Sequence, residues 1–133
     1  LDVVLDNGIQ GVAIGNIAKE RTGLAIKEKD ISGIRGGISG LPIEEKVNNL
    51  IAETYNYCGD KLVIIGVGGI FSAAGAYEKI KRGASLVQLI TGMIYEGPSL
   101  VSSINVGLVR LLKADGYKNV GEAVGSYHRQ LTG

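Results

Sequence analysis

The chain has 133 residues, and its 14 lysines and arginines nearly balance 13 aspartates and glutamates, for a formal net charge of +1. This length suits one domain with its own core, and the balanced charge leaves no basic face of the kind that binds nucleic acid. Cys58 is the single cysteine and His128 the single histidine, which excludes an internal disulfide framework and a cysteine–histidine metal cluster.

The predicted elements alternate between helices and short apolar strands. Residues 1–8 have the pattern of the last turns of a helix that ends at a glycine, and the apolar run 11–15 is short enough for a buried strand. A long polar loop follows, from residue 17 to about residue 42. The spacing of apolar residues then predicts a helix over 44–57, with Leu50 among its apolar positions, and a second buried strand over 62–67.

The alternation continues in the second half of the chain. Ser72 can cap a helix that Gly83 closes, and residues 86–90 form the third predicted strand. Pro98 opens a longer helix that stops at Gly116. The residues predicted to face inward on this longer helix are Val101, Ile104, Leu108 and Leu111.

The C-terminal segment offers little chemistry. Asn119 and Glu122 have the spacing of a capping box for a last short helix through Gln130. His128 lies near the C-terminus and is predicted to be a solvated tail residue rather than a catalyst. Cys58, at the end of the 44–57 helix, is predicted to be a buried and inert thiol.

The order of elements predicts an α/β fold with three parallel strands and helices on one side. Such a sheet leaves two open edges, which natural proteins cover or close. A (β/α)8 TIM barrel closes its sheet on itself and takes ~250 residues. Residues 1–133 are therefore predicted to form a single partial domain, the C-terminal part (about the last three strands) of such a barrel, which needs the remainder of the barrel as its partner.

Two glycine-rich turns carry the clearest functional signal. Residues 66–70 (GVGGI) end the second predicted strand, and Thr91-Gly92 end the third. In barrels the loops after strands seven and eight commonly bind phosphate, because glycine lets backbone N–H groups approach the oxygens. Phe71 stands where a dinucleotide fingerprint needs glycine or alanine, and the Walker pattern is missing its lysine. Turns that serve the fold alone remain an alternative.

Asn16 directly follows the first predicted strand. In barrels, catalytic residues commonly lie at this end of a strand. The amide of Asn16 can both donate and accept hydrogen bonds. A plain turn asparagine is the alternative. No pair of nucleophile and base can be assembled from the sequence, and no metal site is predicted.

At these positions the sequence resembles dihydroorotate dehydrogenase, over nearly the whole chain from Gly8 to Arg129. Three stretches resemble signature segments of that family in order and spacing: GGISGLP at 36–42, IIGVGGI at 64–70 and GASLVQL at 83–89. EGP at 96–98, the helix ending at Leu111-Leu112 and GEAVG at 121–125 are similar to the quinone-reducing, membrane-linked class.

The resemblance implies a flavoenzyme of pyrimidine synthesis that oxidises dihydroorotate to orotate, with FMN as hydride acceptor and quinone as electron acceptor. It implies no catalytic base in this chain, since the family's serine base would lie upstream, together with the helices that meet quinone. It also implies association with the inner membrane of a bacterium or mitochondrion. The chain alone is expected to be inactive.

The residues that match flavin-binding positions of the family are Gly15, Ser39, Gly40, Gly68, Gly69, Ile90 and Thr91, and Asn16 matches a substrate-binding asparagine. The resemblance places the FMN phosphate between Gly68-Gly69 and Ile90-Thr91. A side chain at position 69 is then expected to occupy the space of the phosphate.

The segment 15–18 (GNIA) departs from the family, which usually has threonine, asparagine, threonine and threonine there. The departure removes hydroxyl groups near flavin and substrate. It keeps open a non-catalytic half barrel that serves as a binding or assembly module. Another FMN- or phosphate-binding barrel, related to dihydrouridine synthases or glycolate oxidases, is a further alternative, although the signature stretches argue against it.

Overall fold

Three parallel strands form one sheet in the order β1-β2-β3. A computed structural model describes residues 1–24, 33 and 35–131 of the chain. The strands are β1 (Gly11–Gly15), β2 (Val63–Val67) and β3 (Leu86–Gln88). Gly15 pairs with Val67 and Val67 with Gln88, so all three strands end at the same edge. The predicted α/β fold with a parallel sheet is confirmed.

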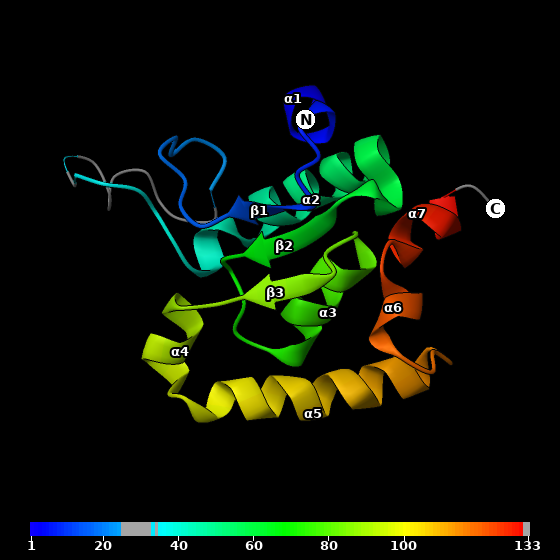
Figure 1. Cartoon of the computed structure of the whole chain (residues 1–133). Helices are drawn as coiled ribbons and strands as arrows, with labels where there is room; N and C mark the ends of the chain where they lie inside the picture. Colours follow the sequence, from blue (N-terminus) through cyan, green and yellow to red (C-terminus); the bar gives the residue numbers. More distant parts are fainter. Residues whose placement is uncertain (25–32, 34, 132–133) are drawn as a thin grey trace.

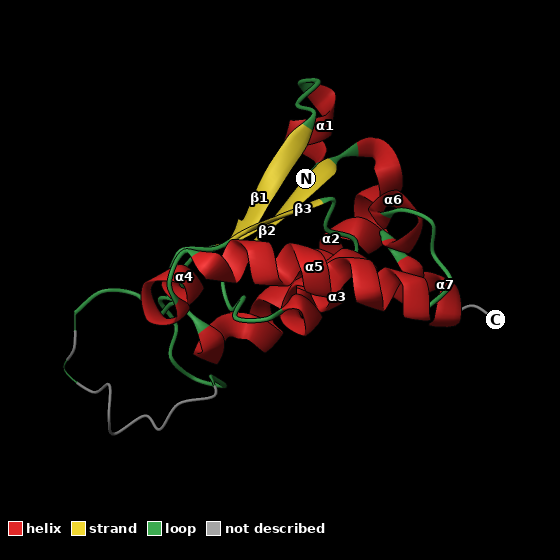
Figure 2. Ribbon diagram, turned by 90° about the horizontal axis from the view of Figure 1, so that it is seen from below, coloured by secondary structure: helices red, strands yellow, loops and turns green. Residues whose placement is uncertain are grey.

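Helices connect and follow the strands, and α3 and α5 lie on the same side of the sheet (Figure 2). The arrowheads of the three strands point towards the side where α4 and the loop after β1 lie (Figure 1). The α-helices are α1 (Asp2–Asp6), α2 (Glu44–Cys58), α3 (Ala73–Lys81), α4 (Thr91–Glu96), α5 (Ser99–Ala114), α6 (Val120–Ala123) and α7 (Ser126–Leu131), and the 3-10 helices are η2 (Leu41–Ile43) and η3 (Gly59–Lys61).

The core lies between the sheet and these helices. Ile51 of α2 and Ile64 of β2 are fully buried and belong to the same apolar cluster between the helix and the sheet. A second cluster joins the turn after β2 to α5 through Ile70 and Ile104, and a third joins α3 to the C-terminal helices through Ile80 and residues around it. Each buried isoleucine contributes about 1.5–3 kcal/mol, which fixes the helices on this face of the sheet.

The opposite face of the sheet has no covering layer among the described residues. Val63 is 44% exposed and Leu86 is 57% exposed, although both are strand residues with large apolar side chains. Parallel sheets are normally covered on both faces. This face therefore has the apolar character of a surface that another layer covers.

The boundaries of several elements differ from the sequence predictions. The predicted third strand over 86–90 is too long, because pairing with β2 stops at Gln88 and the backbone turns at Ile90 to cap α4, a helix that the sequence did not predict. The predicted last helix is two helices, broken where Gly125 adopts a φ of +68°. Leu50 and Val101, predicted to be apolar inward positions, are exposed.

The prediction for His128 is wrong. Its ring is half-buried, with its centroid 5.2 Å from that of Tyr55, and its Nε2 lies 3.1 Å from the carbonyl oxygen of Arg82. Helix α7 docks here because Gly125 also donates its amide to the carbonyl of Ile80. Cys58 is buried as predicted, and burial raises the pKa of its thiol.

Lys79 is a buried cation that the sequence did not single out. Its side chain is fully buried in α3, and its Nζ donates to Oδ1 of Asn48 in α2 at 2.7 Å. Burial lowers the pKa of Lys79 to about 8, against the attraction of nearby carboxylates. The folded protein therefore binds this proton less well than the unfolded chain does.

Replacement of Lys79 by methionine should change how stability depends on pH. Between pH 8 and 9.5 the unfolded chain keeps its lysine protonated while the folded protein releases that proton, so stability rises with pH. At about 1.4 kcal/mol per pKa unit, the gain is on the order of 1–2 kcal/mol. Thermal unfolding at each pH should show the stability of the wild type rising relative to that of Lys79→Met. A stability difference that does not change with pH would contradict the buried charge. Cys58 and Tyr77, whose pKa values burial raises, are common to both proteins.

Candidate functional site

A small recess lies where the parallel strands end. It has a volume of about 20 Å³, and we call it the turn recess. Its lining comes from all three strand ends and comprises Asn16, Val67, Gly68, Gly69, Ile70, Leu89, Ile90, Thr91 and Gly92. None of these residues carries a charge, so a ligand here would meet mainly backbone groups and the polar side chains of Asn16 and Thr91.

The turn after β2 has a backbone that only glycine adopts without strain. Gly68 has a φ of +99° and Gly69 a φ of +73°. On the facing side, Ile90 caps α4 without any side-chain hydrogen bond to the first turn of the helix. The first N–H groups of a helix have no partner within the helix. The turn recess therefore has the glycine-rich turn on one wall and the positive end of a helix on the other.

A second recess, which we call the α4 recess, adjoins the first through Thr91. Its lining comprises Ser39, Gly40, Leu41, Pro42, Phe71, Thr91, Tyr95 and Glu96. Oγ1 of Thr91 donates to Oγ of Ser39 at 3.2 Å. A Cβ on Gly40 would lie 2.9 Å from Cγ2 of Thr91. The predicted residues Ser39, Gly40 and Thr91 are thus in direct contact, although they lie far apart in the sequence.

Two interactions hold the described ends of the long loop. The backbones of Ala18 and Ile38 exchange two hydrogen bonds of 2.8 Å. Nζ of Lys46 in α2 pairs with Oε2 of Glu20 at 3.0 Å, which lowers the pKa of Glu20. Residues 25–32 and 34 of the predicted loop lie outside the described residues. The bridge beside β1 is what brings Ser39 back to the strand ends.

Asn16 has a φ of +94°, and no other described residue except glycine has a positive φ. Its backbone N–H donates to the backbone carbonyl of Val67 at 3.0 Å, which extends the pairing of β1 with β2 by one residue. Asparagine tolerates this backbone better than most residues, but it is uncommon there. This backbone conformation places Asn16 in the lining of the turn recess. Strained backbone of this kind is often found at functional sites.

Gly15 is the predicted site residue that lines neither recess. Its φ is +110°, and a Cβ there would collide with the carbonyl oxygen of Val67 and touch Val47 of α2. Position 15 therefore requires glycine, because β1 lies so close to β2 and α2 there. The other predicted residues (Asn16, Ser39, Gly40, Gly68, Gly69, Ile90 and Thr91) are brought together at the strand ends.

The expected reason for glycine at position 69 is wrong. A Cβ on Gly69 would lie 2.7 Å from Cα of Glu44 and 3.1 Å from its nitrogen. A side chain at this position would therefore collide with the start of α2 rather than fill the turn recess. Gly69 is needed because two backbone segments pack against each other.

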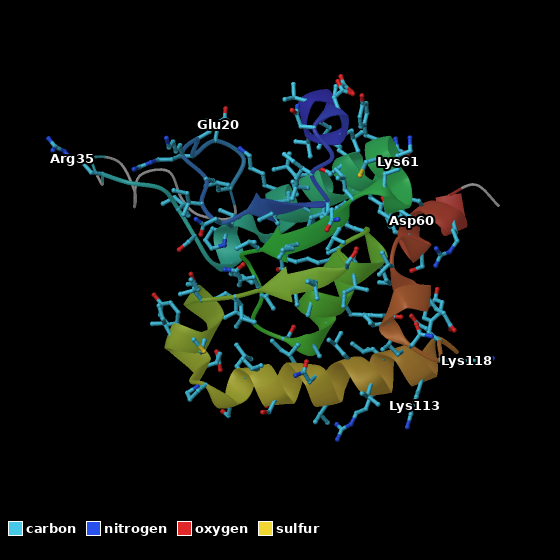
Figure 3. The ribbon with its side chains drawn as sticks, in the orientation of Figure 1. Glu20, Arg35, Asp60, Lys61, Lys113 and Lys118 are labelled. Carbon is cyan, nitrogen blue, oxygen red and sulfur yellow. The ribbon has the colours of Figure 1, made fainter. Side chains whose placement is uncertain are left out.

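Several charged side chains lie at the periphery of the molecule. Glu20 and Arg35 extend from the loop after β1, Lys113 extends from the far end of α5, and Lys118 extends from the loop that follows α5 (Figure 3). Within the described ranges, no group of three His, Cys, Asp or Glu side chains could hold a metal ion. In the part of the chain that the structure describes, no helix has the length and apolarity to cross a membrane.

Comparison with known proteins identifies one family. The sequence model of dihydroorotate dehydrogenase matches residues 1–112. A dihydroorotate dehydrogenase (quinone) from Anaeromyxobacter dehalogenans is 39% identical over 98% of this chain and 35% of the relative, and one from Deinococcus radiodurans is 41% identical over 92% of this chain and 32% of the relative. The crystal structure of DHODH from Eimeria tenella with ferulenol has a TM-score of 0.86 and 31% identity over 96% of this chain and 34% of that chain. The chain thus spans about a third of its relatives' length.

Substitution of Gly69 by alanine should destabilise the fold more than the same change at a glycine in open space. Gly116, at the end of α5, has a φ of +81°, and a methyl group added there would meet no atom within 4 Å, so Gly116→Ala adds backbone strain alone. We expect that strain to cost about 1–2 kcal/mol. Gly69→Ala should cost a further 1–3 kcal/mol, approximately the cost of overpacking. Denaturant unfolding of both variants measures the difference, and equal losses would contradict the close contact with Glu44.

Proposed function

Because this chain belongs to the dihydroorotate dehydrogenase family, we propose that residues 1–133 form one partial domain, the C-terminal part of a (β/α)8 TIM barrel. The barrel would oxidise dihydroorotate to orotate, with FMN as hydride acceptor and quinone as electron acceptor. In this proposal the present chain supplies the FMN phosphate site. The observation that carries it is the meeting of two glycine-rich turns and Asn16 where three parallel strands end.

The open sheet supports the barrel. The exposed apolar side chains of Val63 and Leu86 lie on the face that would become the interior of a closed barrel. β1 and β3 are edge strands of this sheet, and free edges favour pairing with further strands. Strands from the remainder of the barrel would satisfy both edges and cover the apolar face at once.

The turn recess fits a phosphate group better than a neutral ligand. Gly68 and Gly69 line the recess, and the uncapped start of α4 adds partial positive charge. Charge-assisted hydrogen bonds from backbone N–H groups to phosphate are stronger than bonds between neutral groups. Ser39 and Gly40 line the adjoining α4 recess, so they would lie beside the remainder of the cofactor.

When bound, FMN would accept the hydride that leaves dihydroorotate. The residues of this chain would bind and orient. The Asn16 amide can donate to and accept from the substrate, and Thr91 would link the phosphate wall to Ser39 through its hydroxyl group. The base, the helices that meet quinone and the association with the inner membrane would come from the remainder of the protein.

A non-catalytic assembly module is a second candidate, favoured by the GNIA segment. Ala18 is 8% exposed and bonded through its backbone to Ile38. A Cβ on Gly37 would lie 2.9 Å from Cδ1 of Ile17. The residues that replace two threonines of the family thus pack against the returning loop. Turnover by the full-length protein separates the two candidates, since an assembly module would show none.

The isolated chain of 133 residues should not oxidise dihydroorotate, because the proposed base and quinone site lie in the remainder of the protein. The assay is reduction of a quinone analogue with dihydroorotate and added FMN. The full-length protein serves as the positive control. Steady-state turnover by the isolated chain would place the catalytic residues within it and would contradict the proposal that they lie in the remainder of the protein.

A negative charge at position 90 should weaken FMN binding by the full-length protein. Ile90 lines the turn recess and is 57% exposed, so Ile90→Glu can be accommodated and would repel a dianionic phosphate. We expect a loss of about tenfold in affinity, or about 1.4 kcal/mol. Ile94→Glu is the matched control, because Ile94 lies in α4, the helix that Ile90 caps, is 73% exposed and lines neither recess. Flavin fluorescence titration measures the FMN affinity of both variants. Equal losses of affinity in the two variants would place the phosphate elsewhere.

A further inference from the structure

A buried polar cluster joins α2 to α3 outside the two recesses. Lys79 of α3 has no exposed surface, and Asn48 of α2 is 4% exposed. Nζ of Lys79 donates to Oδ1 of Asn48 at 2.7 Å. A lysine is rarely fully buried, because desolvation of its charge is costly unless it is paired. This lysine therefore occupies a place where an apolar residue would be the simpler choice for stability alone.

The surroundings of Lys79 are built to accommodate it. A Cβ on Gly66 of β2 would lie 3.3 Å from Cδ of Lys79, so glycine leaves space for the lysine side chain beneath the sheet. The carboxylates of Glu44 and Glu78 attract its charge, and the guanidinium of Arg82 opposes it. Glu44 lies four residues before Asn48, on the same face of α2. Lys79, Asn48 and Glu44 thus form a cluster, which we call the Lys79 cluster.

The Lys79 cluster reaches the turn recess through the first turn of α2. The backbone of Glu44 packs against Gly69, with Cα of Glu44 2.7 Å from the Cβ position of Gly69. The preceding residue, Ile43, places its Cδ1 3.1 Å from the Cβ position of Gly68. Any shift of this end of α2 would therefore move the turn that forms one wall of the recess.

A second bond between the same helices provides a comparison. Nη1 of Arg82 donates to Oδ1 of Asn49 at 2.7 Å, so it also joins α3 to α2. This bond is exposed, whereas that of Lys79 with Asn48 is buried. Exposed polar pairs contribute little, and buried ones are costly to break. The Lys79 bond is therefore the one that can hold α2 in a fixed position.

We propose that Lys79, acting through Asn48 and Glu44, is a positioning residue that holds the Gly68-Gly69 turn in the geometry required to bind the phosphate of FMN. This inference rests on the proposed function, since it assumes that the turn recess receives that phosphate. Lys79 does not line the recess and does not touch the ligand. Its effect is selective, because the turn would meet the phosphate and not the isoalloxazine ring.

The test compares FMN with riboflavin, which has the same ring system and no phosphate. Both are titrated by fluorescence against the full-length protein and its variants, with thermal unfolding as a check of folding. Lys79→Met should bind FMN about tenfold more weakly and riboflavin within about twofold of the wild type. Asn48→Ala should lose about fivefold for FMN alone. Asn49→Ala, the matched control, should leave both affinities unchanged.

A conservative variant separates positioning from general destabilisation. Asn48→Asp keeps an acceptor of the same size for Lys79, so it should retain the preference for FMN over riboflavin, and it tests the inference even if Lys79→Met fails to fold. Equal losses for FMN and riboflavin in Asn48→Ala, or full FMN affinity in a folded Lys79→Met, would overturn the inference. A wild type without any preference for FMN would instead overturn the proposed phosphate site itself.

Discussion

The close packing of the Gly68-Gly69 turn against the start of α2 is the contact on which the site depends. The Cβ position of Gly69 lies 2.7 Å from Cα of Glu44, so no side chain fits between the two segments. The positive φ of both glycines turns the chain away from β2 and into α3 within a few residues. The turn is thereby fixed at the strand ends, beside Asn16 and the start of α4, where a phosphate can be bound by backbone groups.

The sequence predicted the order and direction of the strands because each is a short apolar run followed by glycine. It also predicted which residues gather at the strand ends, but mainly through the resemblance to a known family. It missed α4 because Thr91-Gly92 has weak helical propensity, and the turn at Ile90 is set by tertiary contacts such as the burial of Gly92 against Ile70.

Other errors had a similar origin. A fixed helical period cannot show that Lys79 lies among inward residues, because a lysine is expected at the surface. His128 looked like a tail residue because its partners, Tyr55 and Arg82, are distant in the sequence. For Gly69 the expected reason for the glycine was wrong, since the direction of a missing Cβ is visible only in three dimensions. Long-range packing decides all of these features.

The central claim is that the turn recess binds the phosphate of FMN, and a crystal structure of the full-length protein with FMN tests it most directly. We predict phosphate oxygens within hydrogen-bond distance of backbone nitrogens in both the Gly68-Gly69 turn and the Ile90-Thr91 start of α4, with Ser39-Gly40 beside the cofactor. A phosphate held instead by lysine or arginine side chains, away from both glycine-rich turns, would contradict it.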